Sequence, residues 1–267
     1  MSLLYLLIIS IVQGVTEFLP ISSSGHLVLL PSLLGQEDQG QAIDVAVHVG
    51  TLGAVVIFFW SDVRQGIAGV PRLLSGRIDT PGAKLAFLLC VATVPVVLVG
   101  LFIKVIGIVE MMRSIEVIGW AMLIFGLVLY IADQKGAHNK TANEWSTVDA
   151  IKLGLWQTIA LIPGTSRSGI TITGARILGY SREDGAKIAM LMSIPTILAS
   201  GVLLGAEVAG QADWTLLKYA SIGTLFAFFA ALLALTLMMR LLKSVSFTPY
   251  VIYRIILGII LLGIAYT

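Results

Sequence analysis

Residues 13–26 read QGVTEFLPISSSGH, and residues 163–171 read PGTSRSGIT. Each stretch ends an apolar run at a proline and passes through serine and glycine into a second short apolar segment. Proline stops a helix, and broken backbone at membrane depth is tolerated only where it is buried in protein or lines a wet cavity. The two stretches are therefore interpreted as the tips of re-entrant hairpins that face each other or water.

The composition indicates an integral membrane protein. The 267 residues are 57% hydrophobic and 12% charged, with a net charge of +2. Soluble domains carry about a quarter charged residues, whereas a lipid-facing surface needs few. The composition excludes a disordered chain, a disulfide scaffold and a nucleic-acid binder with a broad basic face. The single cysteine, Cys90, is expected to be a small core residue.

Ten apolar segments divide into two kinds by length. A membrane-spanning helix needs about 20 residues. Six segments reach that length, at about 43–60, 84–103, 115–133, 184–206, 214–239 and 248–266, whereas those at about 3–19, 25–35, 150–162 and 168–179 are short or interrupted. The predicted fold is an all-α polytopic membrane protein with six transmembrane helices and two re-entrant helical hairpins.

The two halves of the chain resemble each other. A shift of 144 residues aligns Gln13 with Gln157 and Ser22 with Ser166. Each half contains a hairpin and three spans, and because three is odd, the second half enters the membrane from the opposite side. We expect one transmembrane domain, residues 1–267, made of two inverted-topology repeats (about 1–133 and 150–267) joined by a cytoplasmic loop.

Charge placement predicts the orientation. If residues 61–83 are cytoplasmic, the positive-inside rule is obeyed. The inside residues are then Arg64, Arg72, Arg77, Lys135, Lys140, Arg240 and Lys243, and the outside charges are Lys104, Arg113, Glu207 and Asp213. Both termini lie outside in this arrangement. The first hairpin enters from the outer face and the second from the cytoplasmic face.

The first tip combines a carboxylate, hydroxyls and an imidazole. Gln13 and Glu17 share a helix face, and a carboxylate within the membrane is a candidate functional group because it is costly there. Ser22–Ser24 and His26 follow. They can hold an anion at a helix N-terminus or supply a nucleophile and a proton carrier. The alternative is that the serines only cap a helix and that His26 is an ordinary polar residue.

The second tip places an arginine between serines. The planar fork of Arg167 suits phosphate. An unpaired arginine at this depth is expensive, so Arg167 needs an anion, which is either Glu17 or a ligand. Thr171, four residues later, can turn its hydroxyl into the same pocket or bond to its own helix.

Two other polar residues within the spans receive structural interpretations. His48 is expected to be a packed polar residue rather than a ligand. Arg254 is expected to extend its side chain to the membrane interface.

The motifs in both tips resemble those of a known family. Gln13-x-x-x-Glu17 matches a (Glu/Gln)-x-x-x-Glu motif, His26 follows at the expected place, and residues 163–171 match Pro-Gly-x-Ser-Arg-Ser-x-x-Thr. With the SFTPYVIYR segment at residues 246–254, they are similar to undecaprenyl-diphosphate phosphatases of the bacitracin-resistance protein family. The resemblance covers nearly the whole chain. It departs at Gln13, where many relatives carry Glu, which leaves one carboxylate fewer for a metal.

The resemblance implies hydrolysis of a C55 polyprenyl diphosphate to the monophosphate and inorganic phosphate at the outer face of the bacterial plasma membrane. This reaction recycles the carrier lipid for peptidoglycan synthesis and raises bacitracin tolerance. It also implies a divalent cation, Mg²⁺ or alternatively Ca²⁺. The expected partners are the polyprenyl diphosphate, membrane lipids and a second copy of the chain in a homodimer, and no nucleic acid.

The residues then receive expected roles. Ser23 is the nucleophile, with Ser22 or a water molecule as open alternatives, and His26 is the general acid or base. Glu17, with Gln13, holds the metal or orients His26. The diphosphate is bound by Arg167 with Ser22, Ser24, Gly164, Ser166, Ser168 and Thr171.

Two rival functions remain to be weighed. Another class of lipid phosphatase also uses a Ser-Gly-His element, but it requires a histidine where this chain has Thr173. A transporter or flippase of polyprenyl phosphate or another anion shares inverted repeats and broken helices with anion sites at their N-termini. A carrier needs only charge and shape, whereas an enzyme needs the serine and the histidine.

Overall fold

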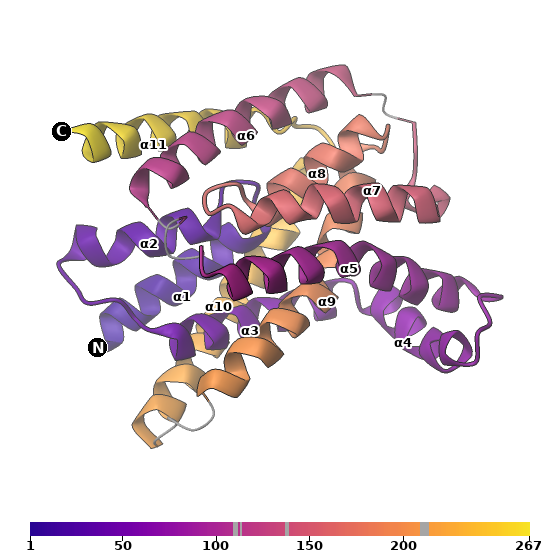
Figure 1. The fold of residues 1–267 in the computed structure, drawn as a ribbon, viewed down its shortest axis with the longest axis horizontal. Helices are drawn as coiled ribbons and strands as arrows, with labels where there is room; N and C mark the ends of the chain where they lie inside the picture. The colour runs from indigo at the N-terminus through magenta and orange to yellow at the C-terminus, as the bar shows by residue number, and fades with distance from the viewer. Residues whose placement is uncertain (109–111, 113, 137–138, 209–213) are drawn as a thin grey trace.

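The computed structural model describes residues 1–108, 112, 114–136, 139–208 and 214–267. Within these ranges the regular structure is helical, which confirms the predicted all-α class (Figure 1). The α-helices are α1 (Leu3–Phe18), α2 (Ser23–Leu34), α3 (Gln41–Phe58), α4 (Trp60–Leu74), α5 (Pro81–Ile106), α6 (Ile115–Lys135), α7 (Thr147–Thr158), α8 (Arg167–Ile177), α9 (Arg182–Val208), α10 (Trp214–Leu241) and α11 (Thr248–Tyr266).

Six of these helices are long and apolar enough to cross a membrane. They are α3, α5, α6, α9, α10 and α11, and they match the six predicted spans. Many of their large apolar side chains are exposed, as lipid-facing residues are. Cys90 is exposed on α5, so its prediction as a core residue is wrong. In a membrane protein the apolar residues of a span are divided between core and lipid, and sequence polarity does not separate the two.

The four remaining short helices near the predicted tips form two pairs. α1 leads into α2 through residues 19–22, and α7 leads into α8 through a short 3₁₀ helix (Ile159–Leu161) and residues 162–166. The chain bends at two serines, Ser22 with φ 72° and Ser166 with φ 71°. Each serine hydroxyl caps the following helix by accepting the N–H of Gly25 or Gly169, at 3.4 and 3.1 Å. The two tips therefore share one local geometry.

The helices pack in corresponding pairs. α10 lies against α1 and α3, α5 lies against α7 and α9, and α6 runs beside α11. Gly50 permits the close approach of α3 to α10, because a Cβ there would lie 2.2 Å from the Thr224 carbonyl oxygen. The largest apolar core surrounds Phe18 at the first tip and includes Met190 and Phe247.

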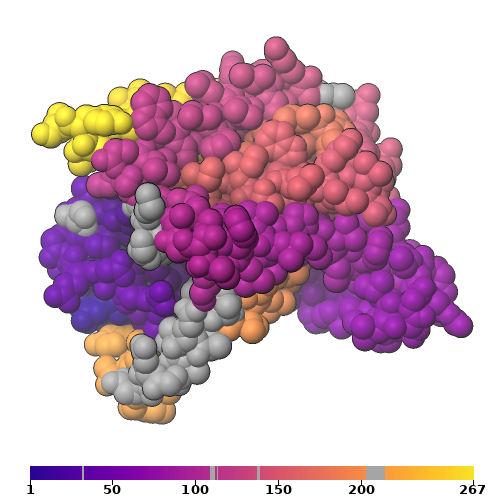
Figure 2. Space-filling model, in the orientation of Figure 1, coloured from indigo at the N-terminus to yellow at the C-terminus, as the bar shows by residue number. Residues whose placement is uncertain are grey.

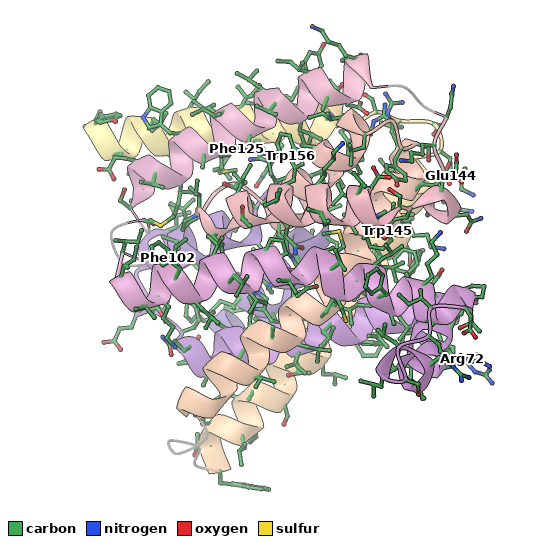
Figure 3. The ribbon with its side chains drawn as sticks, turned by 45° about the vertical axis from the view of Figure 1, so that its right-hand side comes forward. Arg72, Phe102, Phe125, Glu144, Trp145 and Trp156 are labelled. Atoms are coloured by element: carbon green, nitrogen blue, oxygen red, sulfur yellow. The ribbon has the colours of Figure 1, made fainter. Side chains whose placement is uncertain are left out.

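The ends of the helices fall into two groups. Both termini lie at the same end of the molecule, on the left in Figure 1, and the connection between α4 and α5 lies at the opposite end. Figure 2 shows the α4 region projecting there from the main body. Figure 3 places Phe102 toward one end of α5, with Arg72, Glu144 and Trp145 toward the other.

A buried ionic cluster anchors α8 at the end away from its tip. Asp133 of α6 accepts hydrogen bonds from Arg176, Arg182 and the backbone N–H of Phe247 at 3.2, 2.8 and 3.2 Å. Arg176 is fully buried. Next to this cluster, burial and a 2.7 Å hydrogen bond to Asp149 raise the pKa of the Tyr180 phenol above its usual value. These contacts join α6, α8, α9 and α11 in one rigid support.

Candidate active site

Glu17 is the centre of the polar cluster between the two tips. It lies in the last turn of α1 and is 7% exposed. Its Oε2 accepts hydrogen bonds from Gln13 Nε2 and Ser23 Oγ, both at 2.7 Å. Its Oε1 forms an ion pair with Arg167. A carboxylate with these donors is stabilised in its ionised form, although it is almost completely removed from water.

Arg167 begins α8 and connects the second tip to the first. The sequence left open whether its partner would be Glu17 or a ligand, and the structure pairs it with Glu17. A second hydrogen bond runs from Arg167 to the Ser193 carbonyl at 3.2 Å. The tips are also joined directly, because the Ser168 hydroxyl donates to the Leu19 carbonyl at 3.0 Å.

The hydroxyl groups assigned to phosphate binding differ in exposure. Ser22 lies 3.3 Å from Ser24, and Ser166 lies 3.1 Å from Ser168, between hydroxyl oxygens. Ser24 is exposed, whereas Ser166 and Ser168 are buried. The buried Thr171 hydroxyl has no hydrogen-bond partner among the described residues. The structure thus gathers the predicted hydroxyls at the two tips, and those of the second tip and α8 are more buried than Ser23 and Ser24 of α2.

A cavity of about 400 Å³ opens beside Ser23. Ser23 and Ser24 line it from the first tip, and Pro163 lines it from the second. Asp44 and His48 of α3 complete its polar wall. The cavity is the space in which a small charged group could meet the Ser23 hydroxyl, and it is far too small for a long lipid chain.

His26 does not line this cavity. Its Nδ1 is 2.7 Å from the carbonyl oxygen of Ser22, and its Nε2 is 2.5 Å from the hydroxyl oxygen of Tyr253 on α11. The hydroxyl of Ser23 is bonded to Glu17 instead. The structure therefore brings Ser23 to a carboxylate and His26 to Tyr253 on α11.

His48 is a site residue that the sequence interpretation missed. Its Nε2 is 3.7 Å from Glu17 Oε2, and its Nδ1 is 2.7 Å from the Asp44 carbonyl oxygen. Its side chain is 37% exposed and lines the cavity. The prediction of a packed polar residue is wrong for this side chain. A histidine inside a span was the available signal, but hydropathy does not say which neighbour it meets.

Arg254 is the second missed residue, and its predicted extension to the membrane interface is wrong. The side chain is fully buried. It donates to the carbonyl oxygens of Pro20, Gly164 and Ala121 at 3.4, 3.2 and 3.3 Å. Carbonyls at a broken helix have no helical partner, and burying them unbonded is costly. Arg254 therefore holds both tips through their backbone.

The polar cluster around Glu17 offers few ligands for a metal ion. The described residues contain no group of three or more His, Cys, Asp or Glu side chains arranged to hold a metal ion. Gln13 Oε1, however, is buried and has no hydrogen-bond partner among the described residues. The Nε2 of the same side chain donates to Glu17, so this oxygen lies close to the carboxylate. Mg²⁺ is commonly held by one or two carboxylates together with substrate phosphates. Gln13 and Glu17 fit a cation held jointly with a phosphorylated ligand.

The fold and the site together define a multi-pass membrane protein with a buried polar cluster, centred on Glu17 and Arg167, between two pairs of short helices. Residues 6–260 match the family described as bacitracin resistance protein BacA, and the chain belongs to this family.

Several proteins that the chain matches over its full length are named undecaprenyl-diphosphatases. The chain is 68% identical to an undecaprenyl-diphosphatase of Jannaschia sp. (strain CCS1) over 266 residues and 66% identical to one of Ruegeria pomeroyi over 267 residues, with 100% of each chain covered. It is 42% identical to undecaprenyl-diphosphatase 1 of Rhodospirillum rubrum, over 100% of this chain and 96% of the relative.

Proposed function

We propose that this chain is an undecaprenyl-diphosphate phosphatase, which hydrolyses the C55 lipid diphosphate to the monophosphate and inorganic phosphate. The observation that carries the proposal is the cluster in which Ser23, Glu17 and Arg167 meet beside a cavity of headgroup size. Family membership and the names of the full-length relatives support the same reaction. The activity recycles the carrier lipid for peptidoglycan synthesis and confers bacitracin tolerance.

Ser23 is proposed as the nucleophile. Its hydroxyl already donates to Glu17 at 2.7 Å, so the proton passes to this carboxylate as Oγ attacks the terminal phosphorus. The bond from phosphorus to the bridging oxygen breaks, and the lipid monophosphate leaves. Water then cleaves the phosphoserine and releases inorganic phosphate. The alternative, in which Ser23 and Glu17 orient a water molecule for direct attack, differs by forming no phosphoserine.

Arg167 is proposed to bind the diphosphate and to neutralise charge in the transition state. The free protein pairs Arg167 with Glu17. An arriving diphosphate competes for the guanidinium and thereby releases the carboxylate to act as the base. Ser24, Ser166, Ser168, Thr171 and the N–H groups at the starts of α2 and α8 supply further donors.

His26 is proposed to support the first tip from its place between the Ser22 carbonyl and Tyr253 of α11. The sequence assigned it general acid–base work, and its bond to the Ser22 carbonyl gives it a second role in shaping the tip. A divalent cation, Mg²⁺ or Ca²⁺, would be held by Glu17 and Gln13. When bound, it would offset the negative charge of the phosphates.

We further propose that α1–α2 and α7–α8 are re-entrant hairpins of two inverted-topology repeats, about 1–133 and 150–267, within a single domain. The matched φ values of Ser22 and Ser166 support this arrangement. So does the correspondence between the pair α1 and α10 and the pair α7 and α5.

The proposed location is the bacterial plasma membrane, with both termini and the cavity on the outer side. The termini lie at one end of the molecule. The cavity is lined by Asp38 and Gln39, between α2 and α3, and by Ile103 near the end of α5. In the orientation that the basic residues favour, these segments lie at the outer end.

The experiment is phosphate release from undecaprenyl diphosphate by the purified protein in detergent. We expect Ser23→Ala to abolish release and Ser200→Ala to leave it unchanged. Ser200 is an exposed serine of α9 that bonds only within its own helix, which makes it a matched control. Turnover of the Ser23→Ala variant at the wild-type rate would refute the proposed nucleophile, and no release by the wild type would refute the phosphatase.

The second candidate is a transporter or flippase of polyprenyl phosphate or another anion, which the paired broken helices favour. Reconstituted vesicles separate the two functions. Movement of a labelled polyprenyl phosphate across the bilayer without hydrolysis of the diphosphate would favour transport. Hydrolysis without movement favours the phosphatase.

A further inference from the structure

Tyr253 of α11 lies directly against the imidazole of His26. Its hydroxyl oxygen is 2.5 Å from Nε2. The two rings are nearly parallel, with planes 6° apart and centroids 5.6 Å apart. Because the hydroxyl oxygen is so close to Nε2, they meet edge to edge. The other nitrogen, Nδ1, is 2.7 Å from the Ser22 carbonyl oxygen. Both ring nitrogens of His26 therefore have a partner: Nδ1 contacts the first tip itself, and Nε2 contacts α11.

These partners determine which nitrogen of the neutral imidazole carries the proton. A carbonyl oxygen can only accept a hydrogen bond, so Nδ1 of His26 must donate to Ser22. Nε2 is then the unprotonated nitrogen, and it accepts the hydroxyl proton of Tyr253. The structure assigns the Nδ1–H tautomer to His26, with the Tyr253 hydroxyl as the donor that holds it.

The Ser22 carbonyl belongs to a strained residue. A φ of 72° is uncommon for a residue other than glycine, and such conformations persist only where surrounding contacts enforce them. The next residue is Ser23, whose hydroxyl donates to Glu17 at 2.7 Å. A tip that relaxed at Ser22 would rotate the Ser23 hydroxyl away from its carboxylate.

We propose that Tyr253 is a positioning residue that acts on Ser23 through His26. Its hydroxyl fixes the orientation of His26 by donating to Nε2, and His26 in turn holds the strained Ser22 carbonyl through Nδ1. The catalytic consequence rests on the proposed phosphatase function, whereas the tautomer does not depend on it. Tyr253 itself is bonded to His26 and does not line the cavity beside Ser23.

The first test separates the hydroxyl from the ring. Tyr253→Phe keeps the aromatic ring and removes the donor, and we expect kcat to fall about ten-fold with KM changed less than about two-fold, as for loss of one net hydrogen bond. Tyr250→Phe is the matched control, because Tyr250 lies one turn earlier on α11 and its ring contacts Phe247. The kcat of Tyr253→Leu, which also loses the aromatic ring beside His26, is expected to fall further. A kcat for Tyr253→Phe equal to that of the control would overturn the proposal.

The second test reads the tautomer without any substrate. Nitrogen-15 NMR of histidine-labelled wild-type protein in micelles distinguishes Nδ1–H from Nε2–H, and the signals that vanish in His26→Gln belong to His26. We expect Nδ1–H in the wild type. In Tyr253→Phe we expect the same tautomer, because the Ser22 carbonyl still accepts from Nδ1, but with the Nε2 signal shifted by the loss of its hydrogen-bond donor. An Nε2–H wild type would overturn the proposal even if the variant failed to fold. Loss of all activity on polyprenyl diphosphate in the wild type would refute the phosphatase but leave the tautomer assignment standing.

Discussion

The ion pair between Arg167 and Glu17 should account for much of the stability of the contact between the two tips. The two side chains are 16% and 6% exposed. Removing one partner of a buried pair costs about 3–5 kcal/mol, because the other charge stays buried and unpaired. Each partner keeps other hydrogen bonds, Arg167 to Ser193 and Glu17 to Ser23. We therefore expect the low end of the range, about 3 kcal/mol, for Arg167→Gln or Glu17→Gln.

Thermal unfolding in detergent measures this loss. About 3 kcal/mol corresponds to a melting temperature lower by about 6–12 °C in a chain of this size. The double variant should lose less than the sum of the singles, by about 2 kcal/mol, since it leaves no unpaired charge. Arg72→Gln is the control. It breaks a pair with Asp79 of 2.6 Å whose side chains are 49% and 51% exposed, and it should cost at most about 1 kcal/mol.

Two results would refute this reasoning. Strict additivity of the singles in the double variant would mean that the two side chains do not stabilise each other. A melting temperature for Arg167→Gln no lower than that of Arg72→Gln would mean that burial of the pair adds nothing. In either case the contact between α1 and α8 would have to depend on the Ser168–Leu19 bond and apolar packing instead.

Three further predictions concern the residues that hold the tips and helices in place. Arg254→Met should abolish phosphate release and lower the melting temperature, because the Pro20 and Gly164 carbonyls lose their donor; retained activity would contradict that role. Gly50→Ala should destabilise the protein by more than about 1 kcal/mol, because its Cβ would overlap the Thr224 carbonyl, and a melting curve equal to the wild type would refute the close approach. Asp133→Asn should lower the melting temperature, since Arg176 stays buried with a weakened partner, while kcat of the folded protein at a lower assay temperature stays near the wild-type value.

The sequence predicted the spans well because hydropathy and length alone determine them. It also predicted the two interrupted segments, because Pro20 and Pro163 are each followed by serine and glycine. Proline alone is not sufficient, since Pro95 and Pro195 lie inside α5 and α9.

The partners of polar side chains are a different kind of information. In the sequence, Arg254 is simply an arginine near the end of a span. Only the fold shows that it lies between the carbonyls of Pro20 and Gly164, which come from tips far apart in the chain.

The two histidines show the same limit within the site. Sequence reasoning favoured His26, because it follows the serines directly, and treated His48 as packing. The structure turns His26 toward Tyr253 and places His48 in the cavity near Glu17. On α2, the residues that line the cavity and the residues that face α11 alternate within one turn. A short helix with mixed polarity all round gives no periodic signal to separate these faces.

The proposed repeat places different side chains at equivalent positions of the two tips. Ser23 and Arg167 are 144 residues apart, and each is the first residue of its half-helix, directly after a serine with the same φ. Both point to the same carboxylate, Glu17, whose counterpart in the second half is Leu161. Two similar backbones thus present a hydroxyl and a guanidinium to one charge. This difference is what the proposed mechanism requires, because it places the proposed nucleophile, Ser23, and the proposed phosphate-binding group, Arg167, on opposite sides of one carboxylate.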